Sequence, residues 1–278
     1  MPIIKANKAG FCFGIKRAVE ITFEASEKKE SIETYGQLLH NDQVTNRLKD
    51  HGVHVINRLE DSQSDTLVIR AHGVEEAIEH KAIMKGLEVI DCTCPYVKKV
   101  HRIVKKQDEK GKKIVIVGDK DHPEVVGIRG WCQSSLVINS LEEALALEGG
   151  NYCFVAQTTL NQDLWRTIES GLDHKENLFF NTICLATKER QDAARLLATE
   201  VDGMIVIGGY HSSNTKKLHE ICKSICKNTL HIEKKSDLVM TNLENCVNIG
   251  ITAGASTPDW IIDEVYDYLV QWEKMKSQ

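Results

Sequence analysis

Short apolar runs alternate along the chain with longer segments in which apolar residues recur at helical spacing. After Cys12, apolar residues from Ile15 to Phe23 fall on one face of a helix, and the extended run SIETYG follows. The same order returns after Cys94, where the extended run is KIVIVG, and after Cys184, where it is GMIVIGG. Short strands that alternate with helices are typical of parallel sheets covered by helices. The pattern therefore predicts an α/β fold.

These segments form an internal repeat with three copies. Each copy has a polar residue 28 positions after its cysteine, and these residues are His40, His122 and Ser212. Each copy continues with a helix, a short strand and a further strand with a polar end; the ends contain His72, Thr158 and Ser256. The third copy lacks the last strand of the other two, and Pro2 to Lys5 can supply it. We expect three similar lobes with parallel sheets around a pseudo-threefold axis. Their predicted limits are 14–94, 95–181 and 182–278, the last completed by 1–13.

The repeat directs three cysteines to one centre, because ligands bind beyond the carboxyl ends of strands in such sheets. Three thiolates can hold zinc with an open fourth position, or three irons of a 4Fe–4S cluster with the fourth iron open to substrate. Zinc sites usually draw on local pairs, whereas these cysteines are 82 and 90 residues apart, which favours a shared cluster. The opposing interpretation is that all three are small buried hydrophobic residues. The other six cysteines, including Cys92, Cys222 and Cys226, are expected to pack in the core.

Polar side chains follow the predicted strand ends. Glu124 comes after the second-copy strand, where a carboxyl group beside a metal centre can transfer a proton if its surroundings keep it protonated; a solvated loop carboxylate is the alternative. Hydroxyls, an amide and histidines at equivalent points outline an anion site, although Ser and Asn also cap helices. This set comprises His40, His72, His122, Ser212, Ser213, Asn214 and Ser256. His211 is either a further donor or a surface residue. No glycine-rich nucleotide-binding motif occurs.

Composition narrows the classes of partner. The net charge of −5 provides no basic field for nucleic acid or anionic lipid, so neither nucleic acid nor membrane is expected as a partner. The apolar runs are too short to span a bilayer and no signal peptide is visible, so a cytoplasmic protein is expected. Nine cysteines without an export signal argue against a disulfide framework.

Eight segments, in order and spacing, resemble the LytB/IspH family of 4-hydroxy-3-methylbut-2-enyl diphosphate reductases. They are AGFCFGIKRA, RAHGV, TCPYVKKVH, GDKDHPEVVG, QTTL, ICLATKERQ, SSNTKKL and ITAGASTPDW, and the resemblance runs from residue 3 to about residue 265. It implies a three-lobed enzyme with one 4Fe–4S cluster per subunit. It also implies a reaction, in which two electrons and two protons remove the allylic hydroxyl of the substrate as water. The products are isopentenyl and dimethylallyl diphosphate, and the step is the last of the methylerythritol phosphate pathway.

The resemblance also implies roles for individual residues. The cluster thiolates fall on Cys12, Cys94 and Cys184. The seven residues of the anion site named above match the positions that bind the diphosphate. Glu124 matches the proton donor and Thr158 the residue that assists the substrate hydroxyl, with Gln157 and Thr187 as neighbours. A reduced ferredoxin or flavodoxin is the implied electron donor, and a monomer is expected. Two other functions stay open: a three-cysteine cluster synthase or hydratase of the quinolinate-synthase type, and a non-catalytic iron–sulfur sensing module.

Overall fold

The computed structural model describes residues 2–173, 175–240 and 243–276, in which strands and helices alternate from end to end. The strands are β1 (Ile3–Lys5), β2 (Ile32–Tyr35), β3 (Val53–Ile56), β4 (Thr66–Ile69), β5 (Glu88–Asp91), β6 (Lys113–Val117), β7 (Ser135–Ile138), β8 (Tyr152–Ala156), β9 (Leu178–Phe180), β10 (Gly203–Ile207), β11 (Thr229–Ile232) and β12 (Ile249–Ala253). The helices are α1 (Phe13–Ser26), α2 (Asp42–Asp50), α3 (Glu76–Met84), α4 (Pro95–Asp108), α5 (Pro123–Arg129), α6 (Leu141–Leu145), α7 (Gln162–Gly171), α8 (Leu185–Glu200), α9 (Ser213–Ile225) and α10 (Asp259–Lys276).

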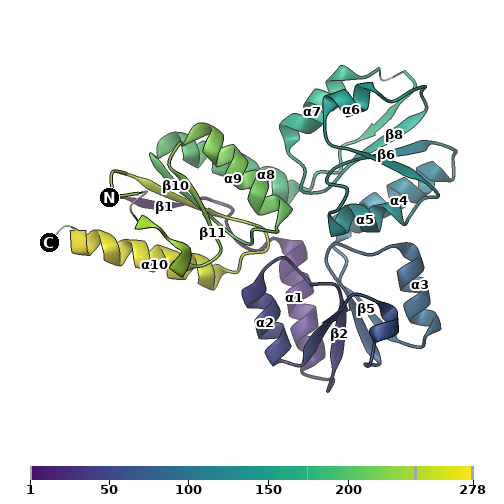
Figure 1. Cartoon of the computed structure of the whole chain (residues 1–278), viewed down its shortest axis with the longest axis horizontal. Coiled ribbons are helices and arrows are strands. Elements are labelled where there is room, and N and C mark those ends of the chain that lie inside the picture. The colour runs from purple at the N-terminus through teal and green to yellow at the C-terminus, as the bar shows by residue number, and fades with distance from the viewer. Residues whose placement is uncertain (1, 174, 241–242, 277–278) are drawn as a thin grey trace. The chain divides into compact units, whose positions relative to one another are not determined.

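The strands form three four-stranded sheets in which every neighbouring pair is parallel. The first sheet has the order β3-β2-β4-β5, the second β7-β6-β8-β9 and the third β1-β12-β10-β11. The central strands β6 and β8 of the second sheet lie side by side in Figure 1. The N-terminal strand β1 thus completes the third sheet by pairing with β12. The predicted α/β class with three parallel sheets is confirmed.

The chain divides into two compact units, which are described separately. The smaller unit comprises the described parts of Met1–Phe13, His40–Val44 and Leu185–Gln278, and it contains the third sheet. The larger unit comprises the described parts of Gly14–Leu39 and Thr45–Cys184, and it contains the first and second sheets. The lobe limits expected from the sequence stay a prediction.

Alternation of side chains across the strands explains why helices cover both faces of the second sheet. Ile114 and Ile116 of β6 pack on the side of α4 and α5, where Val104 is also buried. Val115 of β6 faces the opposite side, where Trp165 of α7 fills the core. Each large apolar side chain buried in this way contributes roughly 1.5–3 kcal/mol. A strand buried on both faces therefore reads as the continuous apolar run seen in the sequence.

The three sheets share one backbone feature at their carboxyl ends. The residue after β2, β6 and β10 is a glycine in each case, and its N–H donates to the last carbonyl of the neighbouring edge strand. These bonds run from Gly36 to Ile56 (2.7 Å), from Gly118 to Ile138 (2.9 Å) and from Gly208 to Ile232 (2.8 Å). The repeat seen in the sequence therefore extends to individual hydrogen bonds.

Each sheet also has a point at which the strand order reverses. In the first sheet the chain leaves β2 toward β3 on one side and leaves β4 toward β5 on the other. The same reversal falls between β6 and β8 and between β10 and β12. Ligands of open parallel sheets bind in the crevice beyond the carboxyl ends of the two strands at such a point. The residues that follow these six strands are therefore the ones positioned for chemistry.

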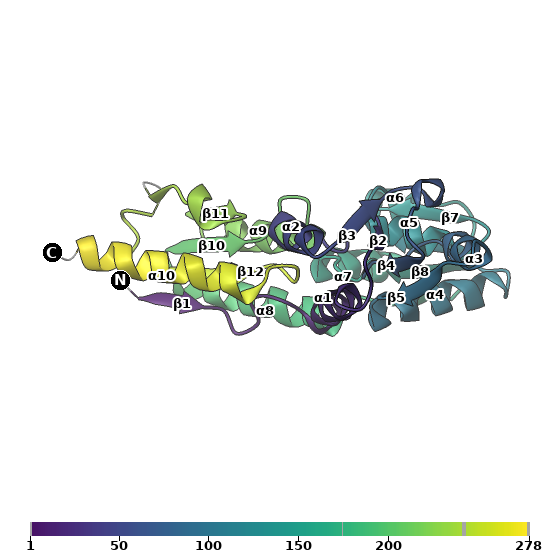
Figure 2. The same cartoon turned by 90° about the horizontal axis from the view of Figure 1, so that it is seen from below.

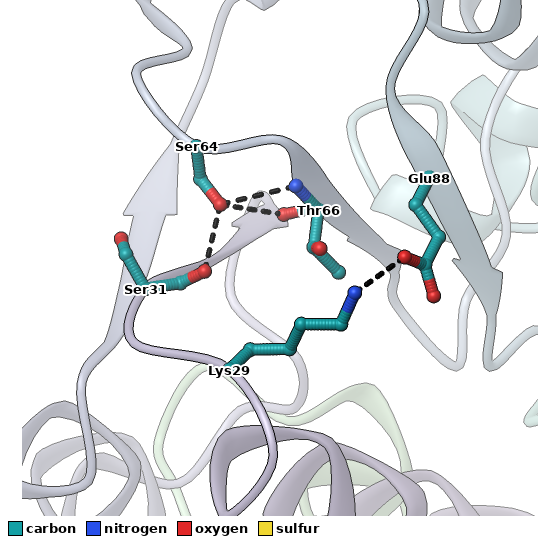
Figure 3. A network of polar contacts seen from close by, with 5 residues as sticks. All are labelled: Lys29, Ser31, Ser64, Thr66 and Glu88. Atoms are coloured by element: carbon teal, nitrogen blue, oxygen red, sulfur yellow. Dashed lines mark hydrogen bonds and ion pairs between the residues drawn. The ribbon is translucent and has the colours of Figure 1, made fainter.

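The amino edge of the first sheet is held by polar contacts within the protein (Figure 3). The Ser64 hydroxyl donates to the Ser31 carbonyl at 2.8 Å and accepts the Thr66 N–H at 3.1 Å. Beside them, Lys29 forms an ion pair with Glu88 at 2.5 Å. This edge has the character of a structural end rather than a binding edge.

In the smaller unit, α10 runs beside β1 (Figure 2). Lys5 of β1 forms an ion pair with Asp263 at 2.7 Å, and its ammonium lies 4.2 Å from the centre of the Tyr266 ring. Within the described residues, no helix combines the length and apolar character needed to cross a membrane.

Candidate functional site

Each of the three repeat cysteines directly precedes a helix. The pairs are Cys12 with α1, Cys94 with α4 and Cys184 with α8. The positive end of a helix dipole stabilises a thiolate, so this position lowers the cost of the charged, metal-binding form of the side chain.

The three cysteines also share one hydrogen bond. The N–H of each donates to the carbonyl of the residue two positions after β12, β4 or β8. These bonds are Cys12 to Ala255 (3.2 Å) in the smaller unit, and Cys94 to Ala71 (3.0 Å) and Cys184 to Thr158 (3.0 Å) in the larger unit. The three cysteines therefore occupy equivalent positions in their repeats, as their spacing predicted.

Exposure separates these cysteines from most of the others. Cys12, Cys94 and Cys184 are half-buried, whereas Cys92, Cys153, Cys222, Cys226 and Cys246 are buried. Burial raises the pKa of Cys92 to about 11 and that of Cys222 to about 12, so these thiols stay protonated at neutral pH. Packing was the expectation for the six other cysteines, and five follow it. Cys132 instead lies half-buried in the turn after α5, with its sulfur 3.4 Å from the Arg129 carbonyl.

Space is kept beside the Cys94 sulfur. Gly14, the second residue of α1, packs so closely that a Cβ atom there would lie 2.5 Å from the Cys94 Sγ. Only glycine fits at this position without displacing the thiol. Sequence reasoning did not single out Gly14, because its role depends on a residue 80 positions away.

Glu124 is the second residue of α5 and is only 2% exposed. The backbone N–H of Thr158 donates to Oε1 of Glu124 at 2.6 Å, and the Thr158 hydroxyl donates to Oε2 at 2.8 Å. Burial raises the pKa of Glu124 to about 7, and the two bonds from Thr158 act in the opposite direction. The carboxyl group is therefore poised to hold or release a proton near neutral pH, and the alternative of a solvated loop carboxylate is wrong.

His122 caps α5 directly beside this carboxyl group. Its Nδ1 accepts the N–H of Glu124 at 3.1 Å, so in the neutral ring the proton is on Nε2. His72 follows β4, and its ring centre lies 5.3 Å from that of His122 at an angle of 83°. Gly73 has a φ of +74°, which glycine adopts without strain, and this lets the chain turn here. A Cβ atom at this position would also lie 2.7 Å from the His101 ring, so no other residue fits without displacing that ring. The larger unit thus gathers two predicted histidines beside the predicted proton donor.

The smaller unit holds the predicted hydroxyl and amide residues. Ser212 caps α9 by accepting the N–H of Thr215 at 3.4 Å, and its oxygen lies 3.5 Å from the Ser256 hydroxyl. Ser256 also donates to the His40 carbonyl at 3.4 Å. Asn214 is buried, and neither polar atom of its amide has a hydrogen-bond partner among the described residues. A buried amide without partners is costly, so its presence indicates a position built for a ligand.

The predicted site residues fall into two groups. The smaller unit contains Cys12, His40, Ser212, Ser213, Asn214 and Ser256, and the larger unit contains Cys94, Cys184, His72, His122, Glu124 and Thr158. His211 is exposed. The glycines that close the carboxyl ends of the sheets were missed in the sequence. They were detectable, because each lies 24 residues after its cysteine: Gly36, Gly118 and Gly208.

Comparison with known proteins extends over the whole chain. Residues 3–270 match the model of a family described as LytB protein. A relative from Caldanaerobacter subterraneus subsp. tengcongensis, named 4-hydroxy-3-methylbut-2-enyl diphosphate reductase, is 48% identical over 100% of this chain and 97% of its own length. A relative of the same name from Geobacter sulfurreducens is 44% identical over 100% of both chains.

Two solved structures are also similar. One, described as (E)-4-hydroxy-3-methyl-but-2-enyl diphosphate reductase, the terminal enzyme of the non-mevalonate pathway, is 42% identical with a TM-score of 0.70. It covers 98% of this chain and 100% of its own. The other is the E-1-hydroxy-2-methyl-but-2-enyl-4-diphosphate reductase from Plasmodium falciparum, which is 30% identical with a TM-score of 0.89 and covers 97% of this chain and 87% of its own. On the family match and these full-length relatives, the chain belongs to the LytB family.

Proposed function

We propose that this protein is a 4-hydroxy-3-methylbut-2-enyl diphosphate reductase. The reaction breaks the allylic C–O bond and forms a C–H bond, with two electrons and two protons, and it releases water. The products are isopentenyl and dimethylallyl diphosphate. The names of the full-length relatives support this activity. The observation that carries it is the shared hydrogen bond that places Cys12, Cys94 and Cys184 at equivalent positions before three helices.

The LytB family consists of iron–sulfur enzymes, and the finer assignment is one 4Fe–4S cluster held by these three cysteines. The donor set fits, since three half-buried thiols at helix N-termini are soft ligands of the kind that iron–sulfur clusters use. When bound, such a cluster would relay the two electrons from an external reductant, and an iron with an open position would polarise the substrate hydroxyl.

Glu124 is the proton donor in this proposal. Its carboxyl group is buried and has a pKa of about 7, so a large fraction is protonated at neutral pH. Thr158 bonds both carboxyl oxygens and fixes the direction of the group. For proton delivery, the Thr158 hydroxyl accepts the proton of Glu124 and donates its own proton to the substrate oxygen. The net transfer moves one proton from Glu124 to the oxygen that leaves as water.

Neutral or singly charged donors hold the diphosphate in this proposal. They are the side chains of His40, His72, His122, Ser212, Ser213, Asn214 and Ser256. The buried amide of Asn214, which has no hydrogen-bond partner among the described residues, supports its place in this set. Such a set holds the diphosphate by oriented hydrogen bonds, so the allylic carbon is positioned for reduction and water is excluded.

The first test is iron and acid-labile sulfide analysis of the protein purified without oxygen. About four of each per chain are expected in wild type, with loss in Cys12→Ser, Cys94→Ser and Cys184→Ser. Cys132→Ser is the matched control, because Cys132 is also half-buried but lies outside the repeat. Retention of the full iron content in any of the three variants would contradict the ligand assignment.

Turnover with a chemical reductant then tests the activity. Conversion of 4-hydroxy-3-methylbut-2-enyl diphosphate that requires dithionite and a viologen distinguishes this reductase from a cluster synthase or hydratase, which needs no net electrons. An absence of turnover in protein with a full cluster would favour the sensing module. We further propose a reduced ferredoxin or flavodoxin as electron donor, a monomeric state and a cytoplasmic location.

A further inference from the structure

A cavity of about 210 Å³ lies at the carboxyl edge of the first sheet, within the larger unit. Its lining includes Tyr35 and Gly36 at the end of β2, Asn57 after β3, and Arg70 after β4, with Glu75 and the α5 residue Val126. This is the point at which the strand order of the first sheet reverses, the place where parallel sheets bind ligands. None of the lining residues is among the predicted site residues.

Arg70 brings a positive charge into this cavity without a partner. Its Nε is buried and has no hydrogen-bond acceptor in the described part of the chain, and no carboxylate there forms an ion pair with it. Burial lowers the pKa of the Arg70 guanidinium, which still stays charged at neutral pH. Arg70 as a whole is half-buried, and its buried Nε–H without an acceptor is costly to the fold. Its planar donors match a carboxylate or a phosphate.

Tyr35 provides a second donor in the same cavity. Its hydroxyl makes no hydrogen bond with another described residue. Burial, followed by the Glu75 carboxylate, raises the pKa of Tyr35, so the hydroxyl stays protonated and able to donate.

The equivalent position in the second sheet holds a residue whose polar groups are hydrogen-bonded within the protein. Ile69 and Ala156 end β4 and β8, so Arg70 and Gln157 are equivalent residues. Each lies over the glycine of the neighbouring strand, since a Cβ on Gly36 would lie close to Nη1 of Arg70, and one on Gly118 would lie 2.8 Å from Oε1 of Gln157. Gln157 accepts the Asp119 N–H at 3.1 Å and donates to the Thr159 hydroxyl at 3.0 Å.

We propose that the Arg70 cavity binds a small molecule through an oxyanion, either a phosphate or a carboxylate group, separately from the reaction site. The guanidinium of Arg70 binds the anion and the Tyr35 hydroxyl donates to it. Glu75 lines the same cavity and disfavours additional negative charge, so a singly charged group with a hydroxyl or amine beside it fits best. An adjoining recess of about 300 Å³ shares Glu75 and Val126 with this cavity and offers room for the rest of the ligand.

Calorimetric titration of the full-length protein tests this site, with inorganic phosphate in one arm and glycolate, a single carboxylate beside a hydroxyl, in the other. We expect saturable binding in at least one arm, and the stronger arm identifies the class of anion. Arg70→Gln is expected to weaken that binding at least tenfold, and Arg70→Lys about tenfold, because lysine keeps the charge but loses the planar fork. Arg166→Gln is the control of equal charge change on an exposed helix residue and is expected to bind as wild type does.

The outcomes separate this site from the reaction site. Binding that is lost in Arg70→Gln and kept in Arg166→Gln supports the proposal. Binding that is equal in all variants places the anion elsewhere and overturns it, as does an absence of saturable binding in both arms. Tyr35→Phe keeps the charge and the packing of the ring, so it serves if Arg70→Gln does not fold. A three- to tenfold weakening is expected there, and unchanged affinity would count against the proposal. No turnover is measured, so the result does not depend on the proposed reaction.

Discussion

The crevices of the first and second sheets share a backbone plan but differ in how their polar groups are satisfied. Both have a glycine whose N–H bonds to the neighbouring edge strand, and both have a long polar side chain over that glycine. In the second crevice Gln157, Thr158 and Glu124 bond to other groups of the protein. In the first crevice the guanidinium of Arg70 has no such bond in the described residues.

This difference shows that topology places side chains but does not decide what they do. A closed network fixes the orientation and protonation of one carboxyl group, which suits a proton donor. A buried donor left without an acceptor lowers stability and creates affinity for an anion. The same fold position thus serves chemistry in one sheet and, in our proposal, binding in the other.

The largest effect is expected from Glu124→Gln in the second crevice. Glutamine keeps the shape of the side chain but has no acidic proton to transfer, so kcat should fall by roughly 10²–10⁴-fold. Wild-type kcat should decline as the pH rises above about 7, because Glu124 then loses its proton, and this decline should be absent in the variant. The measurement is kcat between pH 6 and pH 9 with a chemical reductant.

Arg70→Gln is the matched control, since it removes a polar group from the equivalent edge of the first sheet. Its kcat should stay within about threefold of wild type, well below the range for loss of a general acid. Iron content should be unchanged in both variants. A Glu124→Gln enzyme with nearly normal kcat would show that the protons come from another group.

The second effect is on how the free energy of unfolding changes with pH. The pKa of Glu124 is about 7 in the folded protein and 4.5 in its ordinary state, so the folded state binds more protons between these values. The stabilising contribution is fully present below pH 4.5 and is lost as the pH rises through 7. Its size is at most about 3 kcal/mol, from the relation between pKa shift and free energy.

Urea unfolding at pH 5 and pH 8 measures this contribution. Wild type should lose more stability between the two pH values than Glu124→Gln does. Equal losses in the two proteins would mean that Glu124 does not titrate in this range when folded.

A third, smaller effect compares the equivalent residues directly. Gln157→Met should lower the free energy of unfolding by about 1–2 kcal/mol, because the Asp119 N–H loses its acceptor. Arg70→Met should raise it by about 1 kcal/mol, because a half-buried side chain whose buried Nε–H has no acceptor among the described residues is replaced by an apolar one. Urea unfolding measures both changes. Changes of opposite sign in the free energy of unfolding would confirm that the polar groups are bonded in the second crevice and left without partners in the first, whereas two losses of similar size would refute it.

Much of the fold could be predicted from the sequence, because strands buried on both faces appear as apolar runs and the cysteines mark the repeat. The spacing of 28 residues also identified His122 and Ser212, which both cap helices after equivalent strands. The pairing of β1 with β12 could be predicted only because the third copy lacked a strand.

Other features depend on contacts between distant residues. The raised pKa of Glu124 arises from burial, which a strand-end position does not reveal. The requirement for glycine at position 14 comes from the Cys94 sulfur, which a Cβ atom there would displace. The Nε of Arg70 is buried without an acceptor among the described residues, and this too depends on the surrounding structure. Arg70 belongs to the RAHGV segment, but the sequence pattern predicted a role only for His72 of that segment.

The smallest effects are expected at the opposite edge of the first sheet, where Ser64 and Lys29 make the contacts of Figure 3. Ser64→Ala should cost about 1 kcal/mol, because the buried N–H of Thr66 loses its acceptor. Lys29→Met should change stability by less than about 0.5 kcal/mol, since both partners of its ion pair are exposed to water and salt. Neither variant should alter kcat or the binding of phosphate or glycolate. A change in anion affinity in Ser64→Ala would show that the two edges of this sheet are coupled, and the anion site would then depend on the whole sheet rather than on the Arg70 crevice alone.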